Sequence, residues 1–284
     1  IRDRYGAGQF VMKKIFPDMS FLHCDYNPSF DGQAPEPIAK NLNPFSKFIK
    51  NNGEIAAGLA TDGDADRIGL FDEKGDFVDS HHILLLLLLY LHKYKSMNGK
   101  VVVAASTTPR VVKLAEMWGL EHDTVQIGFK HIAQQMINED VLIGGEESGG
   151  IAIKGHIPER DGIWMGLVIF EYMAKSGKSL TSLIKEIYEL VGEFKYWRDD
   201  LHINENLKQS IVESCQKNAF QSFGKYNVQN IDTTDGFKFI LSDDEWLMIR
   251  PSGTEPVLRC YAEGKTIENA KDILASCKQT IGVN

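Results

Sequence analysis

The clearest pattern in the chain is an alternation of short apolar runs and amphipathic stretches in its middle third. Residues 101–106 form a β-branched run typical of a buried parallel strand. Further strands are expected at 123–127 and 141–143, and helices at about 109–119, 129–137 and 162–175. The resulting order, β-α-β-α-β, implies a parallel sheet covered by helices.

Both flanks of this middle region have patterns of their own. Upstream, two strand-like runs, 55–60 and 68–72, enclose the polar loop 61–67. Downstream, two helices are expected at 181–194 and 205–220, and extended runs at 197–203, 237–241, 245–250 and 257–263. The last helix carries its apolar residues on one face: Ile267, Ala270, Ile273, Leu274, Cys277 and Ile281.

These patterns predict an α/β protein with two mixed- or parallel-sheet α/β domains followed by a smaller α+β C-terminal domain. The expected boundaries are residues 1–78, 79–191 and 192–284. The length of 284 residues agrees with this division, since domains typically contain roughly 100 residues.

Composition narrows the class of protein. The longest apolar run, 83–91 with six consecutive leucines, is about half as long as a membrane-crossing helix, so it indicates a buried helix and no membrane partner. The four cysteines are far apart and lack CxxC spacing, which argues against a disulfide framework and favours a cytoplasmic location. The net charge of −8 argues against a nucleic-acid partner. It does not exclude an anionic small substrate.

The loop 61–67 places three aspartates at alternate positions: Asp62, Asp64 and Asp66. If the loop curls, their carboxylates can converge on one hard cation, and oxygen ligands favour magnesium or calcium. An EF-hand is less compatible, because Arg67 occupies the place where the sharp turn needs glycine and the flanks are strands. We therefore expect a magnesium site, with a solvated acidic turn or a calcium site as alternatives.

A glycine-rich loop, 144–150, follows one of the expected strands, and α/β sheets bind ligands at the carboxyl ends of strands. Glu146, Glu147 and Ser148 can exchange hydrogen bonds with vicinal sugar hydroxyls. An ordinary strand-to-strand turn would explain the spacing equally well. The functional interpretation therefore depends on the other loops.

The third loop begins at Arg250 and lies between two expected strands. Arginine supplies a forked donor, Ser252 and Thr254 supply hydroxyls, and Gly253 allows backbone N–H groups to form an anion-binding nest. Arg259 lies just beyond the loop. Phosphate binding is the favoured interpretation, and a plain β-turn is the alternative.

The three loops together, DGDADR, GEESGG and RPSGTEP, resemble the metal, sugar and phosphate loops of the α-D-phosphohexomutases, which include phosphoglucomutases and phosphomannomutases. They occur here in the same order and on successive expected domains. The segments YGAG at 5–8, DGQAPEP at 31–37 and GHIPERDG at 155–162 also match that family. The resemblance covers the whole chain from about residue 5 onward.

This resemblance implies four domains around one cleft, the first three α/β and the last α+β. It also implies the following roles. Mg²⁺ would be held by Asp62, Asp64 and Asp66, and Arg67 would contact the transferred phosphoryl group. Sugar hydroxyls would be bound by Glu146 and Ser148. The phosphate that is not transferred would be held by Arg250, Ser252, Gly253 and Thr254, with Arg259 close by.

Two further residues take roles only from the motif context. Lys130 matches a substrate-contacting lysine of the family, and His156 matches a histidine near the reacting hydroxyl that could assist proton transfer. Taken alone, a single lysine or histidine is more often a surface or structural residue. We expect both to belong to the catalytic group with Arg67.

The chain departs from the family in one respect. The family's nucleophile is a serine in a motif like T-A-S-H-N-P, and no such motif occurs in this sequence. Ser148 and Ser252 belong to binding loops, and Ser106 is not followed by His-Asn-Pro. We therefore expect this chain to be a C-terminal portion whose natural intramolecular partner is an N-terminal phosphoserine domain. By itself it would be inactive.

In the complete enzyme, the phosphoserine would convert a hexose 1-phosphate to the 1,6-bisphosphate and take the other phosphate back. Expected cofactors are Mg²⁺ and the hexose 1,6-bisphosphate, and the expected partner is a phosphorylated hexose. The second glutamate of GEESGG favours glucose and mannose phosphates over amino-sugar phosphates. A naturally short, non-catalytic sugar-phosphate-binding protein is the main alternative, and a metal-dependent phosphatase is less well supported.

Overall fold

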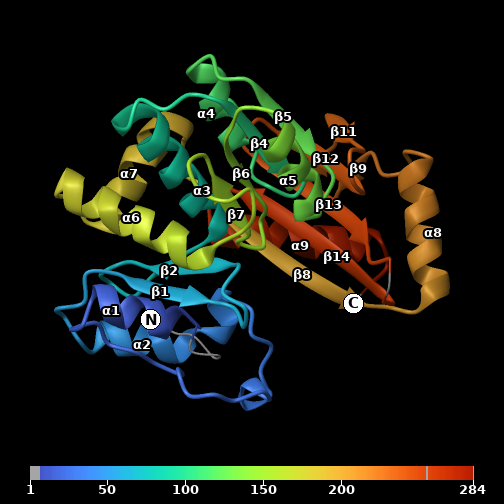
Figure 1. Ribbon diagram of the computed structural model, residues 1–284. Helices are drawn as coiled ribbons and strands as arrows, with labels where there is room; N and C mark the ends of the chain where they lie inside the picture. Colours follow the sequence, from blue (N-terminus) through green and yellow to red (C-terminus); the bar gives the residue numbers. More distant parts are fainter. Residues whose placement is uncertain (1–6, 254, 284) are drawn as a thin grey trace. The chain divides into compact units, whose positions relative to one another are not determined.

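The computed structural model describes residues 7–253 and 255–283 (Figure 1). Its contacts divide the chain into two compact units, Ile1–Val191 and Gly192–Asn284. Each unit is described separately below. None of the helices in the described part of the chain is long and apolar enough to cross a membrane.

The first sheet of unit 1 is a three-stranded meander in the order β1-β2-β3. Its strands are β1 (Gly58–Thr61), β2 (Ile68–Phe71) and β3 (Phe77–Val78), and both pairings are antiparallel. The sequence pattern predicted a mixed or parallel sheet here. The described strands are antiparallel because they are joined by short loops, and a parallel connection needs a crossover of about a dozen residues or more.

Helices cover both faces of this meander. α2 (Asn43–Lys50) is strongly amphipathic and buries Phe45 and Ile49 against Phe71. α6 (Gly162–Ser176), which comes about 100 residues later in the sequence, packs on β1 and β2. Every residue of β1 and β2 is therefore buried.

The second sheet has the order β5-β4-β6-β7. β4 (Lys100–Ala104) pairs in parallel with β5 (His122–Val125) and β6 (Val141–Gly145), whereas β7 (Ile151–Ile153) adds an antiparallel edge. The crossover helices are α4 (Arg110–Met117) and α5 (Phe129–Asn138). The predicted β-α-β-α-β order is present, and the glycine-rich loop is the hairpin between β6 and β7.

The leucine run forms α3 (Ser80–Leu89), in which all ten residues are buried. It packs against α4, α6, α7 (Leu180–Val191) and strands of both sheets. Asp79 caps its first turn by accepting a hydrogen bond from the backbone N–H of His82 at 3.1 Å. The prediction of a buried helix is thus confirmed, and α3 is the element that both sheets share.

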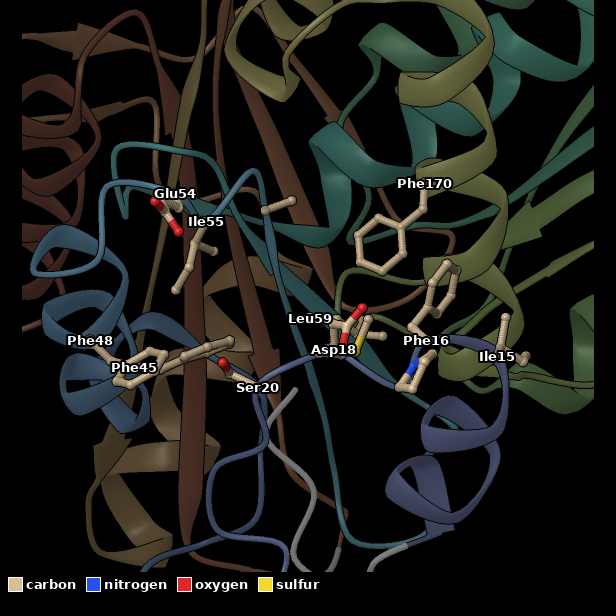
Figure 2. A pocket seen from close by; sticks show the side chains of 13 residues that line it. Ile15, Phe16, Asp18, Ser20, Phe45, Phe48, Glu54, Ile55, Leu59 and Phe170 are labelled. Carbon is tan, nitrogen blue, oxygen red and sulfur yellow. The ribbon is translucent and has the colours of Figure 1, made fainter.

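A cavity of about 420 Å³ opens beside α1 (Ala7–Ile15), α2 and α6 (Figure 2). Its lining is mainly apolar, and Phe16 meets Phe170 of α6 edge-on at 6.5 Å between ring centroids. The segment after α1 forms one wall. The sequence patterns predicted neither α1 nor this cavity.

Unit 2 is built on a five-stranded antiparallel sheet in the order β11-β12-β13-β14-β8. Its strands are β8 (Lys195–His202), β11 (Asn230–Asp232), β12 (Phe237–Ser242), β13 (Glu245–Pro251) and β14 (Val257–Gly264). α9 (Ile267–Thr280) buries Ile273, Leu274 and Cys277 in its core. α8 (Glu205–Gln216) and a small hairpin, β9 (Ser222–Phe223) with β10 (Tyr226–Asn227), complete an α+β unit.

Candidate active site

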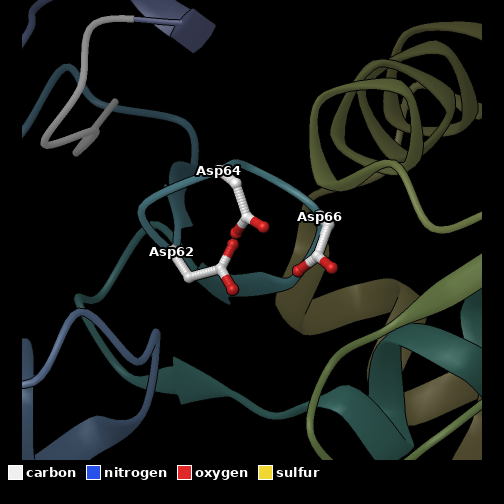
Figure 3. Close-up of side chains that lie close together, drawn as sticks. All are labelled: Asp62, Asp64 and Asp66. Carbon is white, nitrogen blue, oxygen red and sulfur yellow. The ribbon is translucent and has the colours of Figure 1, made fainter. Parts of the chain in front are cut away.

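The metal loop connects β1 to β2, and their pairing is closed by Thr61 opposite Ile68. Within it, one carboxylate oxygen from each of Asp62, Asp64 and Asp66 lies within 4.8 Å of the other two. Figure 3 shows the carboxylates of Asp62 and Asp64 facing each other across the loop, with that of Asp66 beside them. The sequence-predicted triad is therefore assembled on one turn.

The turn is tight enough to force an unusual backbone conformation. Ala65 has φ of 62°, in the left-handed region that residues with a Cβ atom rarely adopt. Its carbonyl accepts a hydrogen bond from the N–H of Gly162 at 2.9 Å. A contact from the start of α6 thus fixes the curl of the metal loop.

Arg67 neutralises part of the acidic cluster. Its backbone N–H donates to Asp62 Oδ1 at 3.1 Å, and its Nε donates to Asp62 Oδ2 at 2.5 Å. Nη1 lies 3.6 Å from Glu36 Oε1, so the same guanidinium reaches a second carboxylate. Asp62 is almost fully buried, and a buried carboxylate is stable only with such a partner.

Asp66 has a different environment. Burial and the neighbouring carboxylate of Asp62 raise the pKa of Asp66 to about 6, although Arg160 opposes this shift. Arg160 Nη2 lies 2.5 Å from Asp66 Oδ2. Close-packed carboxylates of this kind hold protons more tightly because each disfavours the negative charge on the next. A divalent cation bound between them would relieve this repulsion.

Arg160 is a site residue that the sequence analysis did not single out. Besides binding Asp66, its guanidinium lies over the ring of Phe129, 5.4 Å from the centroid. Its aliphatic part covers Gly150, where an added Cβ would lie 2.4 Å from Arg160 Cδ. The only signal for it was its place within the matched run 155–162, because neither its charge nor its spacing marked it out.

The sugar loop turns sharply between β6 and β7. The N–H of Glu146 donates to the carbonyl of Gly150 at 2.9 Å, and Glu146 Oε1 accepts from the N–H of Gly128 at 2.9 Å. Burial and the adjacent Glu147 raise the pKa of Glu146. Glu147 is itself held by hydroxyl donors from Ser80 and Ser106, and Ser148 lies half-buried on the same turn.

The metal and sugar loops are joined through their backbones. Arg67 and Gly150 form an isolated antiparallel bridge, and the N–H of Ile68 donates to the carbonyl of Gly149 at 3.1 Å. Gly149 has φ of 95°, and a Cβ there would lie 2.6 Å from the Ile68 carbonyl oxygen. Loops that are about 80 residues apart in the sequence therefore form one continuous surface.

The two residues assigned from motif context lie at the edges of this surface. Lys130 is exposed on the first turn of α5, two residues after Gly128, whose N–H binds Glu146. His156 Nε2 lies 2.9 Å from Asp161 Oδ2, and its ring stacks on Trp164 at 4.7 Å. Asp161 also caps α6, so the imidazole is oriented by the start of that helix.

In unit 2, the phosphate loop joins β13 to β14. Arg250 and Arg259 are direct cross-strand neighbours, and Arg250 Nε donates to Asp235 Oδ1 at 3.0 Å. Ser252 is buried, whereas Gly253 is exposed. Thr254 lies outside the described residues. The loop thus brings together all the described members of the predicted phosphate group.

Comparison with known proteins follows the same three segments. Models of the phosphoglucomutase/phosphomannomutase family match the chain at residues 3–75 (alpha/beta/alpha domain II), 79–191 (alpha/beta/alpha domain III) and 205–278 (C-terminal domain). The chain belongs to this family. The three loops lie one in each matched segment, which agrees with the recognition made from the motifs.

Individual relatives are similar over nearly all of the chain. It is 30% identical over 273 residues to a phosphoglucomutase/phosphomannomutase of Thermococcus kodakarensis, which covers 95% of this chain and 57% of that protein. It is 31% identical over 277 residues to a phosphoglucosamine mutase of Methanococcus maripaludis, covering 94% and 59%. The chain therefore spans less than two thirds of the relatives it matches, and their names cover more than one sugar.

A crystal structure of a phosphomannomutase-type protein from Thermus thermophilus superposes with a TM-score of 0.81. The sequences are 28% identical, and the match covers 99% of this chain and 60% of that protein. The predicted fold class is thereby confirmed, with the antiparallel first sheet as its one difference in detail.

The aspartate triad was tested against the ion that the family resemblance implies. Three hard oxygen donors within 4.8 Å of one another leave room for an octahedral ion with bonds of about 2.1 Å, whose neighbouring and opposite ligands lie about 3.0 and 4.2 Å apart. The flanking elements are strands, unlike the helices of an EF-hand. The donor set fits Mg²⁺.

Proposed function

We propose that this chain supplies the metal-, sugar- and phosphate-binding parts of a hexose-phosphate mutase that interconverts hexose 1-phosphate and hexose 6-phosphate. The observation that carries the proposal is the joining of the aspartate triad to the Glu146 turn by the hydrogen bond between Ile68 and Gly149. A cation site and a hydroxyl-binding turn held at one surface suit a phosphoryl group attached to a sugar. The nucleophile would be a phosphoserine on a segment outside this sequence.

Each group of residues would act by binding and orientation. Glu146 accepts hydrogen bonds from sugar hydroxyls, and its raised pKa reflects the burial that keeps competing water away. Arg67 and Arg160 present positive charge beside the triad, where a phosphoryl group in transfer needs it. His156, oriented by Asp161, can take a proton from the reacting hydroxyl.

Asp62, Asp64 and Asp66 would hold Mg²⁺, which neutralises charge on a phosphoryl group in transfer. In unit 2, Arg250 and Arg259 with the Ser252–Gly253 backbone would bind the other phosphate. A bisphosphate intermediate would turn around so that each of its two phosphates is transferred in turn. The phosphate that is not being transferred would therefore need an anion site that accepts the sugar in either orientation.

For the sugar, we propose glucose and mannose phosphates, because Glu147 stands where the amino-sugar branch usually has glutamine. Glu147 accepts from Ser106 through its side chain and from Ser80 through its carbonyl, so its carboxylate is held in place. The near-equal identities to a phosphoglucomutase/phosphomannomutase and a phosphoglucosamine mutase give no preference by themselves.

The proposal is tested first by binding and turnover with the 284-residue chain. Calorimetric titration is expected to show Mg²⁺ and glucose 1,6-bisphosphate binding, and a dehydrogenase-coupled assay is expected to show no conversion of glucose 1-phosphate. Absence of both binding events would overturn the proposal. Conversion of glucose 1-phosphate by this chain alone would contradict the proposal that the nucleophile is a serine outside this sequence.

A second function, non-catalytic sugar-phosphate binding, is favoured by one observation: no T-A-S-H-N-P-like motif occurs in the sequence. The intact mass of the native protein in its source cells separates the two functions. A product larger than 31.9 kDa by one domain of roughly 100–150 residues, active in the coupled assay, supports the mutase. A native product of 31.9 kDa that binds without turnover supports the binding protein.

A further inference from the structure

A buried lysine lies beneath the phosphate loop in unit 2. Lys208 is on the first turn of α8, and only 8% of its surface is exposed. Lysine is rarely buried unless its ammonium group is paired. Its position therefore calls for an explanation in terms of its partners.

The ammonium group has three protein partners. Nζ donates to the carbonyl of Ser252 at 3.2 Å and to the carbonyl of Glu255 at 3.1 Å. It also lies 2.9 Å from Glu205 Oε2, one turn earlier on the helix. An ammonium has three N–H donors, so these contacts account for all of them, and two are made with the loop's own backbone.

These contacts set the direction of the loop's peptide groups. In a trans peptide the C=O and N–H point in opposite directions. Because the Ser252 carbonyl points at Lys208, the N–H of Gly253 points away from it. Gly253 is exposed, and an added Cβ there would meet no atom within 4 Å, so the loop leaves room for an anion beside this residue.

Two further hydrogen bonds connect described residues of the loop. The N–H of Ser252 donates to the carbonyl of Val257 at 2.9 Å, and the N–H of Glu255 donates to Ser252 Oγ at 3.3 Å. Lys208 connects the same two residues, Ser252 and Glu255, from below. It therefore fixes the distance between the two sides of the turn.

We propose that Lys208 is a positioning residue for anion binding: it clamps Ser252 and Glu255 so that the Gly253 N–H is presented to a phosphate. This inference rests on the proposed phosphate-binding function of the loop. Lys208 itself does not touch the ligand, because its three donors are committed. Its positive charge under the turn adds to the attraction of the anion.

The test uses the full 284-residue chain with inorganic phosphate and glucose 6-phosphate as probes. Lys208→Met keeps the length and apolar stem of the side chain, and Lys208→Arg keeps its charge. Lys217→Met is the matched control, since Lys217 follows the same helix, is 74% exposed and pairs with Glu213. Affinities come from amide chemical-shift titrations, and hydrogen exchange at Ser252 and Glu255 is measured without ligand.

We expect Lys208→Met to weaken phosphate binding about 10-fold or more and to speed exchange at the two loop amides by about the same factor. Lys208→Arg should recover part of both, and Lys217→Met should change each less than about twofold, because an exposed charge is screened. Exchange at core amides of α9 in the same samples shows whether the variants are folded.

Four outcomes would overturn the inference. Unchanged phosphate affinity in Lys208→Met would do so, as would a loss equal to that in Lys217→Met. Weaker binding with unchanged loop exchange would assign Lys208 a purely electrostatic effect. If the unmodified chain binds neither probe, the proposed function of the loop fails and the inference falls with it, a result distinguishable from the others because no variant is needed to see it.

Discussion

The metal loop of unit 1 and the phosphate loop of unit 2 use the same scaffold for opposite charges. Each is a hairpin connection, between β1 and β2 or between β13 and β14. The first gathers three carboxylates and balances them with Arg67 and Arg160. The second places two arginines on neighbouring strands with a buried lysine beneath. Ligand charge is thus decided by side chains, since the backbone topology is shared.

The two loops also differ in how they are held. The metal loop is fixed by backbone contacts with distant segments, at Ile68 with Gly149 and at Ala65 with Gly162. The phosphate loop has a backbone bond across its own base, between Ser252 and Val257, and is tied to α8 by a side chain, Lys208. A loop held by backbone contacts should be sensitive to changes at glycine, and a loop held by a side chain should be sensitive to changes in charge.

The largest effect is expected from Asp62→Asn in the metal loop. It removes a charged ligand and leaves Arg67 without its buried partner. Because even indirect partners of metal ligands contribute roughly 10- to 100-fold, we expect Mg²⁺ affinity to fall by about 100-fold. Calorimetric titration with Mg²⁺ measures this loss.

The matched control is Asp76→Asn, which removes an exposed carboxylate from the same unit, outside the triad. Its Mg²⁺ affinity should stay within about twofold, because exposed charges are screened. Phosphate binding in unit 2 should be unchanged in Asp62→Asn. Equal Mg²⁺ losses in the two variants would mean that net charge, and not the triad, binds the ion.

A smaller effect is expected from Gly162→Ala, which tests the backbone contact. Its Cβ would lie 2.5 Å from the carbonyl oxygen of Arg67, and such overpacking costs roughly 1–3 kcal/mol. Alanine favours a helix over glycine, so any loss of stability comes from the clash. Urea unfolding of the full chain measures it, together with a drop in Mg²⁺ affinity.

Gly53→Ala is the counterpart, because Gly53 lacks a positive φ and an added Cβ there meets nothing within 4 Å. It should be neutral or stabilise the protein by up to about 1 kcal/mol. If Gly162→Ala behaves in the same way, the metal loop is not held by its contact with α6, and the contrast between the two loops is wrong.

The sequence was most informative where charge or periodicity is local. Asp62, Asp64 and Asp66 alternate within five residues, and the parallel strands of the second sheet are short β-branched runs, so both could be predicted. The buried α3 was equally clear from its unbroken leucines. Each of these signals lies within about a dozen residues, which is the range over which periodicity can be recognised.

Features that depend on distant partners could not be predicted. Arg160 acquires its role from Asp66, 94 residues earlier, and Lys208 acquires its role from Ser252, 44 residues later. The direction of the strands in the first sheet could not be predicted either, because direction depends on which strands pair and apolar runs do not encode pairing. The pattern predicted a mixed or parallel sheet, whereas the described strands are antiparallel. Very short strands such as β9 and β10 offer too few residues for a periodic pattern.

The smallest effect is expected from Ala65→Gly, at the left-handed position of the metal loop. Relief of strain worth about 1–2 kcal/mol is offset by loss of a buried methyl group, about 0.8 kcal/mol, and by unfolded-state entropy, about 0.4–1 kcal/mol. The net change in unfolding free energy should therefore be within about 0.8 kcal/mol. Ala56→Gly, at an exposed position without positive φ, has no strain to relieve and should lose about 0.4–1 kcal/mol. A loss at Ala65 that exceeds the loss at Ala56 by about 0.8 kcal/mol, the contribution of the methyl group alone, would show that the curl of the metal loop carries no strain.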